Sequence, residues 1–250
     1  MPISEQILLF IVSYSANTFS AFAGGGAGLI QLPLLIFLGL MFSTALATHK
    51  VASVALGVGA TIRHLRSRTM DRKFALFILL CGVPGVIAGG FIIVQVPEMT
   101  ARMALGVLTI SLGVYSWLKP AMGLTLKASN RSRKGMLIGG LGLCLIGVLN
   151  GSLTSGTGLF VTIWLVGWFG LDYKSAVAYT LVLVGVFWNG TGAVTIGLLS
   201  QIQWNWLPAL LLGSLLGGFT GAHLAIVAGN RWIKRVFEVI TIAVGLKLIF

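Results

Sequence analysis

The chain reads Gly24-Gly25-Gly26-Ala27-Gly28 after its first apolar run and Thr154-Ser155-Gly156-Thr157-Gly158 at the matching point of its second half. Outward from these two glycine-rich breaks, other residues recur at a similar spacing of 130 or 131 positions. They are Ala45-Leu46-Ala47 with Ala176-Val177-Ala178, Gly82 with Gly213, and Gly90 with Gly221. An internal repeat of this length in an apolar chain predicts two halves packed around a shared axis.

The basic residues give the relative orientation of the two halves. The loop after the third apolar segment of the first half carries five basic residues between 63 and 73, whereas the matching loop 200–206 carries no charge. One loop later the pattern is reversed, because residues 97–98 add no basic side chain and their counterpart 231–235 adds three. Basic loops stay cytoplasmic, so equivalent loops lie on opposite sides of a membrane. The chain is therefore predicted to be an inverted-topology repeat, an architecture typical of secondary transporters.

The composition fixes the class as an all-α polytopic integral membrane protein. Hydrophobic residues make up 57% of the 250 residues and charged residues 9%, and the mean hydropathy is +1.00. A soluble domain of this size could not cover so much apolar surface. The net charge of +12 does not indicate a nucleic-acid partner, because 13 of the 17 Lys and Arg residues fall in the short stretches 63–73, 119–134 and 231–235. Such loops are topology signals and contacts for anionic lipid.

Apolar runs predict about five helical segments in each half, or eight to ten membrane segments in all, some of them short or broken. The expected segments are 5–23, 28–42, 50–62, 74–96 and 101–118 in the first half, and 135–153, 158–170, 175–198, 206–228 and 232–250 in the second. Segments 28–42, 50–62 and 158–170 are too short for comfortable straight spans. An odd number of crossings per half places all basic loops inside and both termini outside.

The chain divides into a first membrane repeat (1–118), a basic cytoplasmic linker (119–134) and a second membrane repeat (135–250), which together form one integral unit. No basic stretch precedes the first apolar run and no small-residue cleavage site follows it. Segment 5–23 is therefore expected to be a retained span and not a signal peptide.

The two breaks are the first candidate for chemistry. Irregular backbone at membrane depth is tolerated only where protein or a water-filled cavity surrounds it. A helix that starts at such a break directs free N–H groups and the positive end of its dipole outward. The candidate ligands are Gly24, Gly25, Gly26 and Gly28 in the first break, and Thr154, Ser155, Gly156, Thr157 and Gly158 in the second. Together they would form an oxyanion site; the alternative is a pair of turns or a helix crossing.

The second candidate is Thr48-His49-Lys50, at the start of the expected third segment. An ionisable residue in a membrane segment is costly and by default suggests function. Lys50 could supply the counter-charge for an anion, and His49 a hydrogen-bond donor or a proton carrier. The alternative is that Lys50 extends to the outer interface. Asn17 and Asn150, which precede the two breaks, either line the pathway or form helix-to-helix hydrogen bonds.

Other chemistries lack the residues that they need. Cys81 and Cys144 lie inside apolar runs, and no His, Cys or carboxylate cluster has the spacing of a metal site. No arrangement of Ser, His and Asp or of paired carboxylates indicates hydrolysis, so an enzyme is not expected.

Gly24-Gly25-Gly26, followed by Pro33 and by Ala47-Thr48-His49-Lys50-Val51-Ala52-Ser53, resembles the sulfite exporter TauE/SafE family, also described as toluene-sulfonate uptake permeases. The resemblance covers essentially the whole chain, although the second break is less glycine-rich than the family leads us to expect. It implies transport of small sulfur-containing anions such as sulfite, thiosulfate or organosulfonates. It also implies a bacterial cytoplasmic (inner) membrane location and no cofactor.

The sequence thus predicts a secondary transporter, on balance an exporter, that moves a small anion by alternating access. The expected partners are the anionic substrate, membrane lipid and a coupling proton or other ion, and the oligomeric state stays open. Two alternatives remain at this point: a passive anion channel, and a transporter of another small anionic metabolite.

Overall fold

The computed structural model describes residues 3–64, 70–92, 98–152 and 156–249. Within these ranges the regular elements are all helical, which confirms the predicted all-α class. The helices are α1 (Ile3–Ala23), α2 (Gly28–Phe37), α3 (Phe42–His64), α4 (Arg72–Ile92), α5 (Glu98–Trp117), α6 (Arg133–Ser152), α7 (Thr157–Gly167), α8 (Tyr173–Tyr179), η2 (Thr180–Trp188), α9 (Asn189–Gly197), η3 (Trp204–Trp206), α10 (Leu207–Ala228) and α11 (Asn230–Ile249).

Several of these helices are long and apolar enough to cross a membrane. In the described part of the chain there are six such spans: α1, α3, α4, α6, the continuous run Tyr173–Gly197 and the run Trp204–Ala228. Two further apolar helices, α2 and α7, have only 10 and 11 residues. Both begin immediately after a glycine-rich break, as the sequence predicts. The chain is thus a multi-pass membrane protein with two short helices between its spans.

The predicted short segment 50–62 is wrong, because α3 is a helix of 23 residues that begins at Phe42. The polar residues between 43 and 50 lower the local hydropathy, but this stretch contains neither Gly nor Pro and the helix continues through it. The preceding break falls instead at Gly39, which has a φ of 98°. Lys50 consequently lies well inside α3 and not at the start of a segment.

The run from Tyr173 to Gly197 changes its winding in the middle. It begins as α8, continues as the π-helix η2 over Thr180–Trp188, and ends as α9. Long π-helical stretches are rare, and short ones are frequent at functional sites. The sequence predicts a single helix here, and apolar patterning carries no signal for the altered hydrogen bonding.

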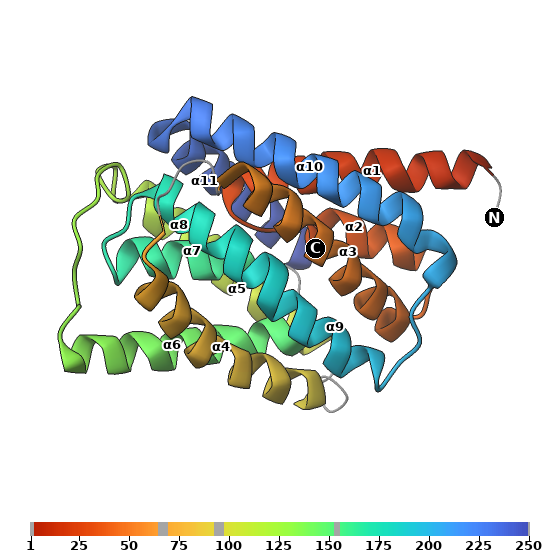
Figure 1. Cartoon of the computed structure of the whole chain (residues 1–250), viewed down its shortest axis with the longest axis horizontal. Helices are drawn as coiled ribbons and strands as arrows, with labels where there is room; N and C mark the ends of the chain where they lie inside the picture. The colour runs from red at the N-terminus through yellow and green to blue at the C-terminus, as the bar shows by residue number, and fades with distance from the viewer. Residues whose placement is uncertain (1–2, 65–69, 93–97, 153–155, 250) are drawn as a thin grey trace.

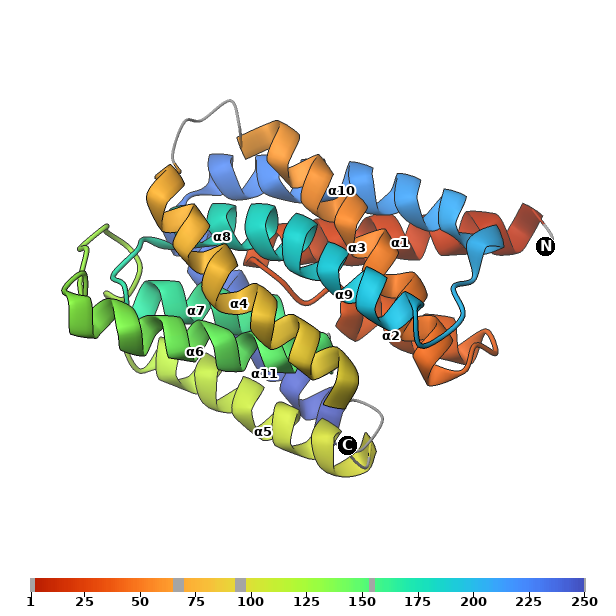
Figure 2. The ribbon, with the colours of Figure 1, turned by 60° about the horizontal axis from the view of Figure 1, so that its bottom comes forward.

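Close helix pairs run along the molecule, and α1 lies beside α10 as α4 lies beside α6 (Figures 1 and 2). Both contacts depend on glycine. A Cβ atom on Gly85 would overlap the Cys144 carbonyl of α6, and one on Gly217 would overlap the Tyr14 carbonyl of α1. Missing side chains let helix backbones approach closely, which is how helices pack in lipid. Under the predicted repeat α1 corresponds to α6 and α10 to α4, so these two pairs would be equivalent; the inverted repeat itself stays a prediction.

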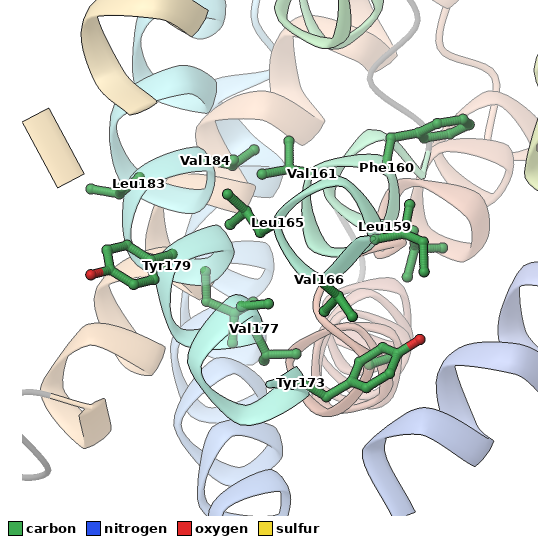
Figure 3. Packing of buried hydrophobic residues seen from close by; sticks show 14 of the residues in the cluster. Leu159, Phe160, Val161, Leu165, Val166, Tyr173, Val177, Tyr179, Leu183 and Val184 are labelled. Carbon is green, nitrogen blue, oxygen red and sulfur yellow. The ribbon is translucent and has the colours of Figure 1, made fainter. Parts of the chain in front are cut away.

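The hydrophobic core surrounds α7 and α8 (Figure 3). Eight of the 11 residues of α7 are buried, and a helix that is apolar on all sides belongs in an interior. Figure 3 shows Val161 and Leu165 of α7 facing Val184 and Val177 of the neighbouring helical run. The short helix α7 is thus held within the core along most of its length.

The ends of the helices that carry the basic residues lie together at one end of the molecule, on the left of Figure 1. They are the end of α3, the starts of α4 and α6, and the start of α11. The N-terminal end of α1 lies at the opposite end. Arg66 and Arg68 of the first basic loop are outside the described residues.

Candidate functional site

The two glycine-rich breaks contact each other. Gly24, Gly25 and Gly26 have φ values of 86°, 148° and 104°, a region that side chains disfavour. Gly25 packs so closely on Gly158 that a Cβ atom on either residue would overlap the backbone of the other. Oγ1 of Thr162 in α7 donates a hydrogen bond to the carbonyl of Gly24 at 2.9 Å. The structure therefore brings the predicted residues of both breaks together.

Each break ends in the same type of turn and starts a short helix. The amide of Leu29 donates to the carbonyl of Gly26 at 3.0 Å, and that of Leu159 donates to the carbonyl of Gly156 at 2.9 Å. The first amides of a helix have no carbonyl partner within it and carry partial positive charge. The starts of α2 and α7 can thus offer backbone donors to an anion. Thr154 and Ser155, also predicted here, lie outside the described residues.

A small cavity of about 40 Å³ lies where the breaks meet α3, α6 and η2. Its lining includes Ser20, Gly25, Gly26, Gly28, His49, Ser53, Asn150, Thr157, Gly158, Thr180 and Asn189. One water needs roughly 10–15 Å³ measured in this way, so the cavity has room for a few waters or a small ion. Its lining offers hydroxyl, amide, imidazole and backbone groups, with no carboxylate among the described lining residues.

Lys50 is fully buried beside this cavity. Its Nζ donates to the backbone oxygen of Asn150 at 2.8 Å and to Oδ1 of the same residue at 3.3 Å. In the described part of the chain Lys50 has no carboxylate partner. Lys50 therefore does not extend to the membrane interface, which was the alternative expected from the sequence. Lys50 is not itself among the cavity-lining residues, but it donates to Asn150, which lines the cavity.

Asn150 links this buried charge to the second break. Its Nδ2 donates to Oγ1 of Thr157 at 2.8 Å and to Oδ1 of Asn189 at 3.4 Å. Thr157 is the first residue of α7, so α3, α6, α7 and α9 meet at one amide side chain. An electrostatic change at Lys50 is therefore passed directly to the cavity wall.

His49 lines the cavity and is held from both sides. Its Nδ1 lies 2.9 Å from Oε1 of Gln31, and its Nε2 lies 3.2 Å from Oγ of Ser53. Because the Gln31 oxygen can only accept, this pair of bonds selects the tautomer with hydrogen on Nδ1. Nε2 then accepts from Ser53, which also lines the cavity. The hydrogen bond to Ser53 thus links His49 to a second lining residue.

Two predicted residues lie elsewhere. Asn17 belongs to the contact between α1 and α10, where its Nδ2 donates to Oγ of Ser214 at 3.0 Å. Thr48 donates to the carbonyl of Thr44 and accepts from the amide of Gln203. Neither is among the residues that line the cavity.

Sequence reasoning did not select Thr180 and Asn189, which line the cavity from η2 and the start of α9. Asn189 carries a weak signal, because it is a lone amide in an apolar run, and polar groups there have a partner or a role. Thr180 occupies the position that corresponds to His49 at the repeat spacing of 131.

A polytopic helical chain with a small polar cavity between two broken helices has the architecture of a membrane transporter. Residues 9–248 match the model of the sulfite exporter TauE/SafE family. A probable membrane transporter protein of Haemophilus influenzae is 26% identical over 245 residues, which covers 97% of this chain and 94% of the relative. One from Sinorhizobium sp is 28% identical over 243 residues, with 96% and 91% covered. One from Escherichia coli K12 is 24% identical over 249 residues, with 97% and 89% covered.

The chain belongs to the sulfite exporter TauE/SafE family. The family and the names of these relatives make it a membrane transporter, in agreement with the sequence prediction. No solved structure matches the chain significantly.

Proposed function

We propose that this transporter exports a small sulfur-containing anion, such as sulfite, thiosulfate or an organosulfonate, across the bacterial cytoplasmic membrane by alternating access. The anion would bind in the cavity between the two breaks. The backbone around Gly24–Gly28 and Thr154–Gly158 would supply donors, Asn150 would orient the ligand, and Lys50 would supply charge. His49 would act as a proton carrier and, once protonated at Nε2, as a further donor.

This proposal rests on the burial of Lys50 without a carboxylate partner among the described residues. A buried charge is costly unless an opposite charge compensates it. Among the described residues the ammonium group has two partners, both of them neutral oxygens of Asn150. An anion in the adjacent cavity would compensate the charge of Lys50. The described groups around this anion would be neutral or positive. The size of the cavity favours a small ion over a larger metabolite.

The contact between the breaks supports alternating access. Gly25 and Gly158 meet backbone to backbone, and Thr162 ties the first break to α7. If the groups of helices around the two breaks move relative to each other, this contact is the place where the path opens or closes. Only glycine leaves enough room for the breaks to meet there. The moving groups would each combine helices of both repeats (1–118 and 135–250), because α1 packs on α10 and α4 packs on α6.

The basic end of the molecule favours export. If that end faces the cytoplasm, its charges concentrate anions at the inner entrance. The membrane potential, negative inside, also favours anion exit, by about 2.3 kcal/mol per charge per 100 mV. Both termini would then lie outside.

Counterflow in proteoliposomes tests the proposal. Vesicles are preloaded with sulfite, thiosulfate, a sulfonate or chloride, and the uptake of a trace labelled anion is followed. The wild type should show saturable counterflow with a sulfur oxyanion. Lys50→Met, which keeps the length of the side chain and removes its charge, should lower the rate by tenfold or more because the counter-charge is gone. Its thermal stability should stay at least equal to that of the wild type, since removing an uncompensated buried charge is not destabilising.

Lys119→Met is the matched control, because Lys119 is exposed at the end of α5. It should transport at the wild-type rate. Counterflow that survives in Lys50→Met would contradict the assigned site. Flux of all anions without counterflow would indicate a channel.

A further inference from the structure

A second cavity is formed by residues other than those of the proposed transport site. It has a volume of about 490 Å³ and lies between the end of α5, the first residues after it, and the start of α11. One wall is formed by Trp117, Pro120 and Leu124, and the other by Arg231, Trp232 and Arg235. None of these residues lines the cavity at the glycine-rich breaks. We propose that this second cavity binds the phosphate headgroup of an anionic phospholipid.

The floor of this cavity is already neutralised. Nζ of Lys234 lies 2.8 Å from Oε1 of Glu238, and both side chains are largely buried. Ser116 closes the cluster, because its Oγ donates to the same Glu238 oxygen at 2.9 Å and its carbonyl accepts from Lys234. Glu238, the one carboxylate among the described residues that line this cavity, is thus bound to Lys234 and Ser116.

Two arginines remain for a ligand. Arg231 and Arg235 are exposed, and in the described part of the chain neither has a carboxylate partner. Both belong to the first two turns of α11, whose first turn carries no acidic residue. Two positive side chains are unfavourable next to the positive end of a helix dipole. A bound anion would offset both the dipole and the two charges. The fork of a guanidinium group matches phosphate oxygens in a bidentate geometry.

The apolar part of the cavity favours a lipid over a free ion. Trp117 and Trp232 flank it with exposed fractions of 66% and 56%, and Trp is the residue that gathers at membrane interfaces. The Arg235 guanidinium lies 5.6 Å from the centre of the Trp232 ring, which holds it at the rim. Leu124 and Pro120 offer an apolar surface suited to a glycerol backbone and the first acyl carbons. Basic pockets between membrane helices are typical sites for acidic headgroups.

Native mass spectrometry of the full-length, delipidated protein tests this site. The protein is titrated separately with phosphatidylglycerol, phosphatidylcholine and soluble glycerol phosphate. Wild type should retain phosphatidylglycerol at least tenfold more tightly than phosphatidylcholine. The double variant Arg231→Gln/Arg235→Gln should lose about tenfold in affinity for phosphatidylglycerol, because each basic residue near a headgroup adds to the attraction. Its affinity for phosphatidylcholine should not change.

The matched control is Arg72→Gln/Lys73→Gln, which removes two exposed charges from the same end of the molecule. This control should keep the wild-type preference. Equal losses in the two double variants would mean diffuse attraction and would overturn the site. Glycerol phosphate that binds as tightly as the lipid would assign the cavity to a free anion instead. The absence of any preference in the wild type would overturn the proposal as well.

Discussion

At the scale of single residues, two lysines are buried in the described part of the chain, and their surroundings differ. Lys234 is compensated by Glu238 at 2.8 Å within one helix. Lys50 has no carboxylate partner among the described residues, and its ammonium group donates to two oxygens of Asn150. A compensated pair is a structural element, whereas an uncompensated cation beside a cavity leaves its charge available to a ligand.

The contrast predicts the effect of Asn150→Asp. The new carboxylate would occupy the place of the amide and would meet the ammonium group of Lys50 at about the present distance of 3.3 Å. It would then compete with the substrate for that charge, so counterflow should fall by tenfold or more while the protein stays folded. Proteoliposome counterflow and thermal melting measure the two effects. Asn150→Ser is the control, because it removes the amide without adding charge. An active Asn150→Asp protein would show that Lys50 does not meet the ligand through this position.

The residues of the site could be predicted in part. Lys50, His49 and the glycines stand out because charge and chain breaks are expensive in a membrane, and the sequence displays them directly. Asn17 and Thr48 carry the same type of signal but lie in helix contacts. Thr180 lines the cavity although nothing in its neighbourhood marks it. Whether a polar residue lines the cavity depends on which face of its helix is turned toward the cavity. A single sequence does not reveal the rotation of a helix about its axis.

At the scale of elements, α3 and η2 cross in close contact next to the site. Gly57 of α3 and Gly185 of η2 lie backbone to backbone, so that a Cβ atom on either would overlap the other. Gly185 also lines the cavity. The π-helical winding and the loss of two side chains together let these helices meet where the polar groups gather.

Gly57→Ala should therefore separate the two helices and disturb the cavity. We expect a lower melting temperature and a loss of most counterflow activity, since backbone must shift to admit the methyl group. Gly190→Ala on α9 is the matched control, because its added methyl group would meet only Val54, at 3.9 Å. It should be as stable as wild type or slightly more, given the helix propensity of alanine. Thermal melting in detergent and counterflow rates check both variants, and similar behaviour of the two would refute the role of the crossing.

The short helices α2 and α7 follow from apolar length and glycine, which the sequence shows directly, whereas the described residues contain six candidate spans and not the predicted eight to ten. The start of α3 could not be predicted from hydropathy. The polar stretch 43–50 lowers the local hydropathy, but the helix continues through it. The π-helical winding of η2 is also hidden, because a run of apolar residues does not distinguish it from an α-helix.

At the scale of the whole molecule, the helix ends next to the three basic stretches lie at one end, while the chain passes back and forth between the ends (Figures 1 and 2). Membrane insertion responds to this asymmetry. The orientation of the chain can thus be tested without any knowledge of its substrate.

Single cysteines report the orientation when Cys81 and Cys144 are first replaced by alanine. Cysteine in place of Lys127, in the linker, should react with a membrane-impermeant maleimide only after the cells are opened. Cysteine in place of Gln201, before α10, should react in intact cells (or spheroplasts, where an outer membrane blocks the reagent). Both positions are exposed. The reverse pattern would invert the proposed topology, and reaction of both from one side would exclude an odd number of crossings between them.

The buried ammonium group of Lys50 also bears on the electrical behaviour of the transport cycle. If protonated Lys50 moves with the site, a carrier loaded with a monovalent anion crosses the field with no net charge, and the empty carrier crosses with one positive charge. The voltage would then act on the return step alone, and a negative interior would draw the empty site inward. Pre-steady-state currents should accordingly appear without substrate, shrink when a monovalent anion saturates the site, and vanish in Lys50→Met.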